Sequence, residues 1–307
     1  MPVFGPVRSR RLGLSLGVDL VPRKVCSMDC VYCEVGRTTL LTTERAEYRS
    51  LSRVMEALER ALREKEFDVI TITGSGEPTL NLRFPEVVER IRSLTPRPLA
   101  VLTNSTLLAV PEVFEALCEV DFVLASLDAA REESFRRVNR PAPGLSAREL
   151  LENLMALRGK MRGELWLEIL LVRGINDAPE DIEALRQALE RIRPHRAQLN
   201  TVVRPPAEPW ARGLTPAEIL ALSRELSAEP LTVAPRGQGR RGAGLSPEEV
   251  EGYLSRRPAP VEELSRAFGV PPEEVRGILD RLAARGRVRP VVFRGETFYR
   301  AVAGGSP

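Results

Sequence analysis

Short apolar runs alternate with stretches of helical periodicity from residue 15 to about residue 228. This alternation constrains the fold strongly, because strands separated by helical segments form β–α units around a parallel sheet. The pattern predicts strands over 16–21, 67–73, 99–103, 122–127, 165–172 and 197–203. It predicts helices over 44–65, 85–94, 111–118, 147–157, 179–192 and 216–227, several with proline at or near the start. We therefore expect an α/β domain of six units.

A Gly- and Arg-rich segment follows these units and is typical of a linker. The predicted organisation is a first domain over 1–228, a linker over 229–244 and a small module over 245–307. In the module, Ser246 is predicted to cap a helix because Glu249 stands three residues later. Further helices over 260–268 and 271–285 precede a hairpin of 288–293 and 297–302. Three short helices closed by a hairpin resemble a winged helix-turn-helix.

Composition sets the outer limits. A chain of 307 residues with 43% apolar residues can bury one large core, or one core and a small module. The net charge of +3 is too small to indicate nucleic-acid binding by itself. No apolar run approaches the length of a membrane span, so no membrane partner is predicted. With no targeting segment visible, we expect a cytoplasmic protein, whose reducing surroundings suit free thiols.

Three of the four cysteines, Cys26, Cys30 and Cys33, stand together in the sequence. Three clustered cysteines cannot all pair in disulfides, and a zinc site would need a fourth Cys or His nearby. The remaining candidates are distant: Cys118 is predicted to be a buried apolar residue of the helix over 111–118, and His195 a loop residue. Thiolates at this spacing favour one iron–sulfur cluster, in which three ligands leave one iron open.

The Cys-x3-Cys-x2-Cys spacing, with Tyr32 before the last cysteine, resembles the cluster loop of the radical S-adenosylmethionine (SAM) superfamily. The resemblance implies a partial (β/α)6 TIM-like barrel and a [4Fe-4S] cluster whose open iron binds SAM. It implies reductive cleavage of SAM to a 5′-deoxyadenosyl radical, which abstracts hydrogen from a substrate. Tyr32 is accordingly a candidate cofactor-binding residue.

Polar residues follow the predicted strands, where ligands of parallel α/β folds bind. Gly74, Gly76 and Glu77 follow the second strand and resemble the superfamily's Gly-Gly-Glu-Pro motif, which holds the amino group of SAM. Ser75 departs from that motif, which commonly has glycine there.

Later strands carry further candidates. Asn104 follows the third strand, and Ser126 and Asp128 stand at the end of the fourth. Such residues often cap the next helix, but the resemblance also implies contacts to the ribose and carboxylate of SAM. Ile175 and Asn176 follow the fifth strand, where the resemblance implies contact with adenine.

Charge distribution adds two hypotheses. Arg8, Arg10 and Arg11 precede the first strand, and are either a solvated basic run or a partner for a substrate carboxylate or phosphate. A similar stretch occurs in a radical SAM subfamily of iron–sulfur oxidoreductases that distantly resembles wybutosine-synthesis enzymes. In the module, the net charge is −4 over 245–275 and +5 from 276 onward. The basic half is the part that would meet a nucleic acid, although such modules also bind proteins.

Two functions remain open on the sequence alone. The first is a radical SAM oxidoreductase acting on an RNA base, a small metabolite or a glycine of another protein, with a reductant such as flavodoxin or ferredoxin. The second is an iron–sulfur sensor that binds DNA and performs no turnover. The second does not account for Gly74, Gly76 and Glu77.

Overall fold

The computed structural model describes residues 2–9, 11–231 and 245–302. Within them, an eight-stranded sheet has the order β1-β2-β5-β6-β7-β8-β9-β10. Only the pair β1–β2 is antiparallel; the other neighbours run parallel. The strands are β1 (Val3–Arg8), β2 (Leu14–Val18), β5 (Val69–Ile72), β6 (Leu99–Thr103), β7 (Phe122–Ser126), β8 (Glu164–Leu171), β9 (Arg196–Thr201) and β10 (Glu229–Pro230). The predicted α/β class with a parallel sheet is confirmed.

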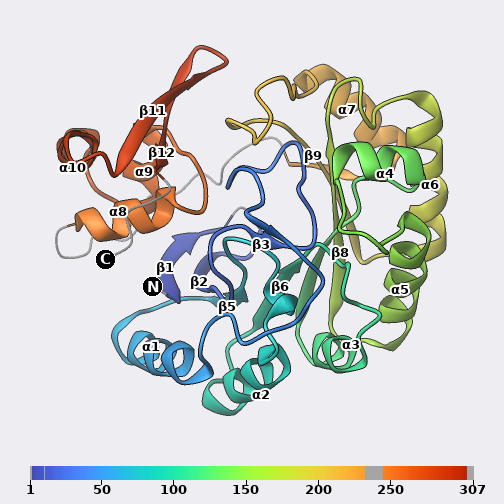
Figure 1. The fold of residues 1–307 in the computed structure, drawn as a ribbon, viewed down its shortest axis with the longest axis horizontal. Coiled ribbons are helices and arrows are strands. Elements are labelled where there is room, and N and C mark those ends of the chain that lie inside the picture. The colour runs from blue at the N-terminus through green and yellow to red at the C-terminus, as the bar shows by residue number, and fades with distance from the viewer. Residues whose placement is uncertain (1, 10, 232–244, 303–307) are drawn as a thin grey trace.

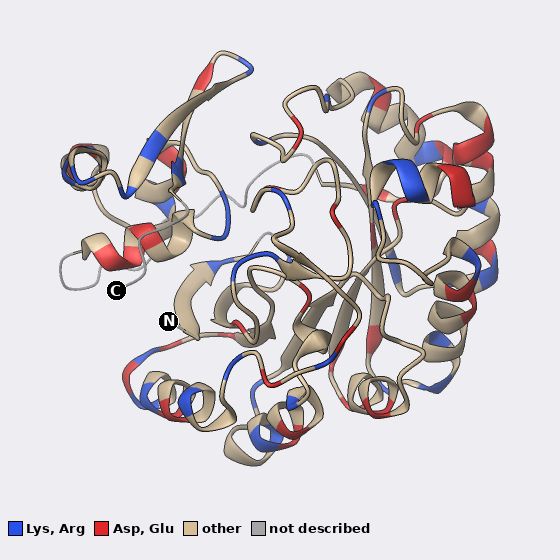
Figure 2. Cartoon of the chain, viewed as in Figure 1, with Lys and Arg blue, Asp and Glu red and all other residues tan. Residues whose placement is uncertain are grey.

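Helices cover one face of this sheet, as expected of a partial barrel (Figure 1). They are α1 (Leu51–Glu64), α2 (Phe84–Leu94), α3 (Pro111–Cys118), α4 (Glu132–Val138), α5 (Ala147–Lys160), α6 (Pro179–Ile192) and α7 (Pro216–Glu225). Their outward faces carry acidic and basic residues side by side (Figure 2). None of the helices that the structure describes is both long and apolar enough to span a bilayer.

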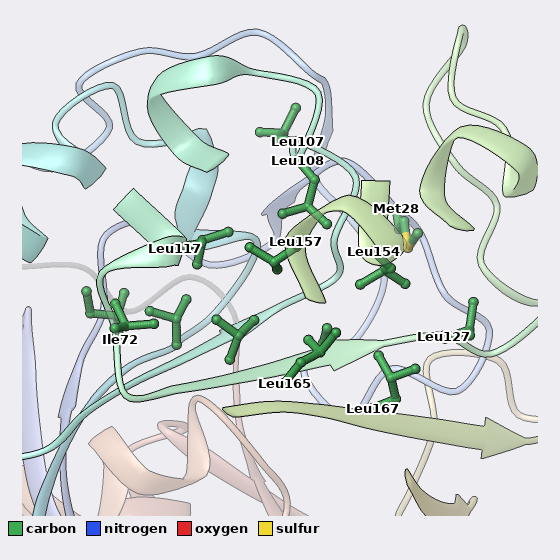
Figure 3. Close-up of a cluster of buried hydrophobic side chains, with 14 of the residues drawn as sticks. Met28, Ile72, Leu107, Leu108, Leu117, Leu127, Leu154, Leu157, Leu165 and Leu167 are labelled. Atoms are coloured by element: carbon green, nitrogen blue, oxygen red, sulfur yellow. The ribbon is translucent and has the colours of Figure 1, made fainter. Parts of the chain in front are cut away.

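The main core lies between the helices and the sheet. Alternate residues of β8, including Leu165 and Leu167, face this layer, where Leu154 and Leu157 of α5 lie over them (Figure 3). Trp166 points to the other face and joins a much smaller apolar cluster inside the partial barrel. Burial of whole leucine side chains contributes about 1.5–3 kcal/mol each. The helix-facing layer therefore supplies most of the hydrophobic stabilisation, and the inner face is left for polar groups.

Several predicted boundaries were wrong. Helix α1 begins at Leu51 rather than at 44, because residue 46 instead forms a bridge with Asn81. Strand β1 and helix α4 were missed; β1 contains Gly5 and Pro6, which disfavour strands, and its register shifts between Phe4 and Val7.

The predicted linker also begins too early. Glu229 and Pro230 pair with β9, so the sheet extends past residue 228. Residues 232–244, most of the predicted linker, lie outside the described part of the chain.

The C-terminal segment has a core of its own. It comprises α8 (Pro247–Leu254), α9 (Val261–Phe268), α10 (Pro272–Ala284), β11 (Val288–Phe293) and β12 (Glu296–Ala301). The capping box of Ser246 and Glu249 is present. Helices α8 and α9 contact β1, and the guanidinium of Arg256 lies 3.8 Å from the ring centroid of Phe4. The segment therefore covers the β1 edge of the sheet (Figure 1).

Candidate active site

The three clustered cysteines lie in one loop that follows the carboxyl end of β2. All three are partly accessible. The first is in β3 (Val25–Cys26), which pairs with β4 (Leu40–Leu41). The middle of the loop is held by hydrogen bonds to residues more than a hundred positions later in the sequence. The backbone N–H of Asp29 donates to the carbonyl of Asn139 (3.0 Å), and the backbone N–H of Val31 donates to the carbonyl of Val138 (3.0 Å). The loop is thus held on both sides.

Each cysteine sulfur accepts a hydrogen bond from a different side chain. Lys24 Nζ lies 3.2 Å from Cys33 Sγ. Asn104 Nδ2 lies 3.6 Å from Cys26 Sγ, and Asn139 Nδ2 lies 3.4 Å from Cys30 Sγ. Hydrogen bonds to cluster sulfurs tune the reduction potential and orient the ligands. Lys24 and Asn139 were missed by the sequence analysis, although a lysine two residues before Cys26 is a local signal for the former.

Burial makes two of these thiols, those of Cys26 and Cys30, poor anions without a cation. It raises the pKa of Cys26 to about 11 and raises that of Cys30 further. Burial also lowers the pKa of Lys24, but the neighbouring cysteines, led by Cys33, outweigh this and the net shift is upward. Metal coordination ionises a thiol directly. The donor set therefore fits a cationic cluster held as thiolates.

The described residues contain no group of three His, Cys, Asp or Glu close enough to hold a single metal ion. In a [4Fe-4S] cluster each cysteine binds a different iron, so the sulfurs stand apart around the cofactor.

The Gly-Ser-Gly-Glu turn after β5 is bonded directly to the cysteine loop. The N–H of Lys24 donates to the carbonyl of Ser75 (2.7 Å), and the N–H of Glu77 donates to that of Val25 (3.1 Å). A Cβ on Gly76 would lie 1.9 Å from the carbonyl oxygen of Val25. Glycine is therefore required here by close backbone approach.

The departure at Ser75 has a structural explanation. Its hydroxyl donates to Asp19 (2.8 Å), a fully buried carboxylate at the end of β2. Asp19 also lies 3.5 Å from Arg256 of the C-terminal segment. This residue was missed, although an acid within a predicted apolar strand was a signal for it.

Glu77 is buried and bonded on both carboxylate oxygens. Oε1 accepts from Thr79 and Thr103, and Oε2 accepts from the N–H of Asn104 (2.7 Å). Burial raises the pKa of Glu77, and these bonds reduce that rise. The carboxylate thus joins the ends of β5 and β6, and Oε2 has fewer protein donors than Oε1.

Tyr32 and Asp128 form the other side of the site. The Tyr32 hydroxyl donates to Asp128 (2.5 Å), which also accepts from Asn139 Nδ2 (2.6 Å) and from the N–H of Leu170 (2.9 Å). Burial raises the pKa of Asp128 to about 6, although Tyr32 and Asn139 stabilise its anion. Asn139 thus bridges Asp128 and Cys30.

The remaining predicted residues lie around this centre. Ser126 ends β7 and is partly accessible, and Ile175 packs on the main core. Asn176 is fully buried; its Nδ2 donates to the carbonyls of Asp128 (2.8 Å) and Leu170 (2.9 Å). Both amide hydrogens of Asn176 are thus used within the fold.

Two residues lie away from the site, as the sequence indicated. Cys118 is buried at the end of α3, in the main core. His195 is exposed in the loop before β9, where Nδ1 accepts from the N–H of Leu165 (2.9 Å).

Two of the N-terminal arginines, Arg8 and Arg11, lie in different surroundings. Arg11 donates to Glu168 (2.5 Å), so its charge is already paired within the fold. Arg8 is exposed, and residue 10 lies outside the described part.

Comparison with known proteins identifies this arrangement. The family model described as the Radical SAM superfamily matches residues 20–189, which include the cysteine loop and the Gly74–Glu77 turn. The chain belongs to the radical SAM superfamily. It is a radical SAM enzyme of unspecified reaction, and the superfamily's [4Fe-4S] cluster and SAM are its cofactors. Membership favours turnover over the sensor hypothesis.

Individual relatives extend the comparison. The chain is 33% identical over 270 residues to a UPF0026 protein of Helicobacter pylori, covering 85% of this chain and 86% of that protein. It is 31% identical to a GTPase Obg of Brachyspira hyodysenteriae over 97% of this chain, but spans only 45% of that relative's length. A radical SAM methyltransferase structure from Sphaerobacter thermophilus shares the fold at a TM-score of 0.51 and 20% identity, covering 73% of this chain and 67% of that one.

Proposed function

We propose that Cys26, Cys30 and Cys33 hold the [4Fe-4S] cluster and leave its fourth iron to SAM. The cluster, when bound, supplies the electron that cleaves SAM to the 5′-deoxyadenosyl radical. The observation that carries the proposal is the arrangement of one nitrogen donor at each cysteine sulfur. Such donors stabilise thiolate ligands without occupying a metal site.

The SAM site is proposed at the turn after β5 and the neighbouring strand ends. Gly74 and Gly76 permit the ligand to approach the backbone, and Glu77 Oε2 accepts from the amino group. Asn104, Ser126 and Asp128 are proposed for the ribose and carboxylate, and Tyr32, Ile175 and Asn176 for the rest of the cofactor. For Asn176 the contact would be through its backbone, since both amide hydrogens are used elsewhere.

We propose that residues 1–228 form the catalytic unit and that 245–307 form a winged helix-turn-helix which presents a nucleic acid. The excess of basic residues from residue 276 onward, over the later part of α10 and the hairpin, supports this. A substrate carried by RNA is the version that this polarity favours over a free metabolite or a protein glycine. The chain has no Gly-x4-Gly-Lys-Ser/Thr sequence, so phosphate binding of the P-loop kind is not part of the proposal.

Two further expectations accompany this function. An external one-electron donor such as flavodoxin or ferredoxin would supply the electron, and a cytoplasmic location would suit the free thiols.

The proposal is tested by anaerobic reconstitution of the full chain with iron and sulfide, followed by dithionite and SAM. We expect release of 5′-deoxyadenosine from the wild type and none from Cys30→Ala. A reconstituted cluster that never cleaves SAM would support a sensor instead. Retained cleavage in Cys30→Ala would contradict the ligand assignment.

A further inference from the structure

Three arginines from separate segments gather where the cysteine loop meets the C-terminal hairpin. Arg23 lies in the loop before β3, Arg289 on β11 and Arg300 on β12; we call them the arginine trio. The hairpin register places Arg289 directly opposite Arg300. Arg23 Nη1 lies 3.5 Å from the carbonyl oxygen of Ala301, so the loop and the hairpin meet here.

The trio lacks acidic partners. Among the described residues, no carboxylate oxygen lies within 4.0 Å of a side-chain nitrogen of any of the three, whereas Arg204 and Arg257 nearby both have acidic partners. Like charges directly opposite each other in a hairpin are destabilising. Burial lowers the pKa of Arg300, and the charges of Arg23 and Arg289 lower it further. The charges of Cys33 and Glu34 oppose this lowering without reversing it, and Glu34 is paired with Arg204. The fold therefore leaves an excess of positive charge at this point.

Two of the three side chains are nevertheless fixed in place by backbone carbonyls. Arg300 Nη2 donates to the carbonyls of Pro205 (2.5 Å) and Glu34 (3.3 Å), and Arg23 Nη2 donates to Val35 (2.9 Å). The Nε of Arg300 is buried and has no hydrogen-bond acceptor. Carbonyls hold a guanidinium without cancelling its charge, so both side chains keep their positive charge and N–H donors that have no acceptor.

The trio is also close to the proposed cluster. The charge of Cys33 acts on both Arg23 and Arg300, opposing the lowering of their pKa by burial. Lys24, a further cation in the cysteine loop, is already bonded to Cys33. An anion on the trio would therefore lie beside the cluster loop, on the side covered by the hairpin.

We propose that the arginine trio binds a phosphate group of the substrate, beside the cluster loop. Guanidinium forks match phosphate oxygens in bidentate geometry, and three cations suit a group that carries up to two negative charges. The inference rests on the proposed function only in assigning the phosphate to the substrate. The phosphate comes from a phosphorylated metabolite or from a nucleic-acid backbone, and the two sources are separable.

The test uses the full chain, reconstituted anaerobically, and isothermal titration with inorganic pyrophosphate and, separately, with a short single-stranded RNA. The variants are Arg289→Gln/Arg300→Gln and Arg300→Lys. Arg148→Gln is the matched control, because that side chain is 85% exposed and pairs only with a neighbour on its own helix. Iron content and SAM binding of each variant report whether the fold is intact.

We expect the double variant to bind pyrophosphate about 10- to 100-fold more weakly, since charged hydrogen bonds are lost. The affinity of Arg300→Lys for pyrophosphate should fall between those of the wild type and the double variant, and that of Arg148→Gln should match the wild type. Binding of pyrophosphate but not of RNA would indicate that the phosphate belongs to a metabolite. Much tighter binding of RNA than of pyrophosphate, lost in the double variant, would indicate a nucleic acid.

Three results would overturn the inference. One is a wild type that binds neither probe. Another is a double variant that binds both probes as the wild type does but releases less 5′-deoxyadenosine when flavodoxin, rather than dithionite, is the electron donor. The arginine trio would then bind the protein reductant instead of a phosphate. The third is an altered cluster potential with unchanged binding, which would make the trio a charge balance for the cluster. If the wild type does not cleave SAM but binds the probes, and the double variant loses that binding, the proposed function is refuted and the anion site is retained.

Discussion

Gly76→Ala should separate the Gly-Ser-Gly-Glu turn after β5 from the cysteine loop. The new Cβ would lie 1.9 Å from the carbonyl oxygen of Val25, a backbone atom that must retreat to at least 3.0 Å. That movement breaks the bonds from Glu77 to Val25 and from Lys24 to Ser75. Overpacking costs about 1–3 kcal/mol and each lost hydrogen bond about 1 kcal/mol, so we expect a loss of about 3–5 kcal/mol.

The assay for Gly76→Ala combines thermal unfolding with the iron content after reconstitution. A loss of that size lowers the melting temperature by about 5–8 °C in a chain of this length, and the displaced loop should retain little iron. Gly159→Ala is the control: no atom lies within 4 Å of its new Cβ, and alanine inside α5 should stabilise the helix by about 0.5–1 kcal/mol. A Gly76→Ala protein that melts and binds iron as the wild type does would refute the reasoning.

Three further predictions concern single side chains. Cys30→Ala should lose the cluster by iron analysis, whereas Cys118→Ser should keep it; equal iron in both would contradict the assignment. Lys24→Met should make the cluster potential more negative in a redox titration, because a buried cation beside a ligand sulfur is removed, while the exposed Lys160→Met should leave the potential unchanged. Burial raises the pKa of Asp128 from 3.8 to about 6, so the folded chain binds a proton that the unfolded chain releases earlier. The free energy of unfolding of the metal-free protein should therefore fall as pH rises from about 4 to 6, and Asp128→Asn should show a flatter dependence in denaturant titrations at several pH values.

The sheet was predictable because its strands are buried on both sides and separated by amphipathic helices. The bounds of α3 and α6 were predicted to the residue, since proline marks each start. Strand β1 was not predictable, because Gly5 and Pro6 argue against a strand and only tertiary pairing with β2 stabilises it.

The site was predictable where its residues form local motifs. The three cysteines lie within eight residues of one another and Gly74–Glu77 are consecutive, so each group forms a local pattern that the sequence displays directly. Asn139 belongs to no motif, and its amide reaches Cys30 and Asp128 only through the packing of the segment after α4. Asp19 likewise gains its partners from Ser75 and Arg256, which stand far along the chain. Contacts of this kind depend on the assembled fold.

The backbone hydrogen bonds from the cysteine loop to residues 138 and 139 imply an order for folding and cluster insertion. During synthesis, the cysteines leave the ribosome more than a hundred residues before Asn139 and Glu208, whose backbone N–H donates to Val31. In a nascent chain that ends before these partners, the three cysteines lie in a loop that lacks these hydrogen bonds. Insertion of iron and sulfide is therefore expected to follow translation of the barrel, and truncated fragments that keep only the cysteine motif should make poor acceptors for an assembly scaffold.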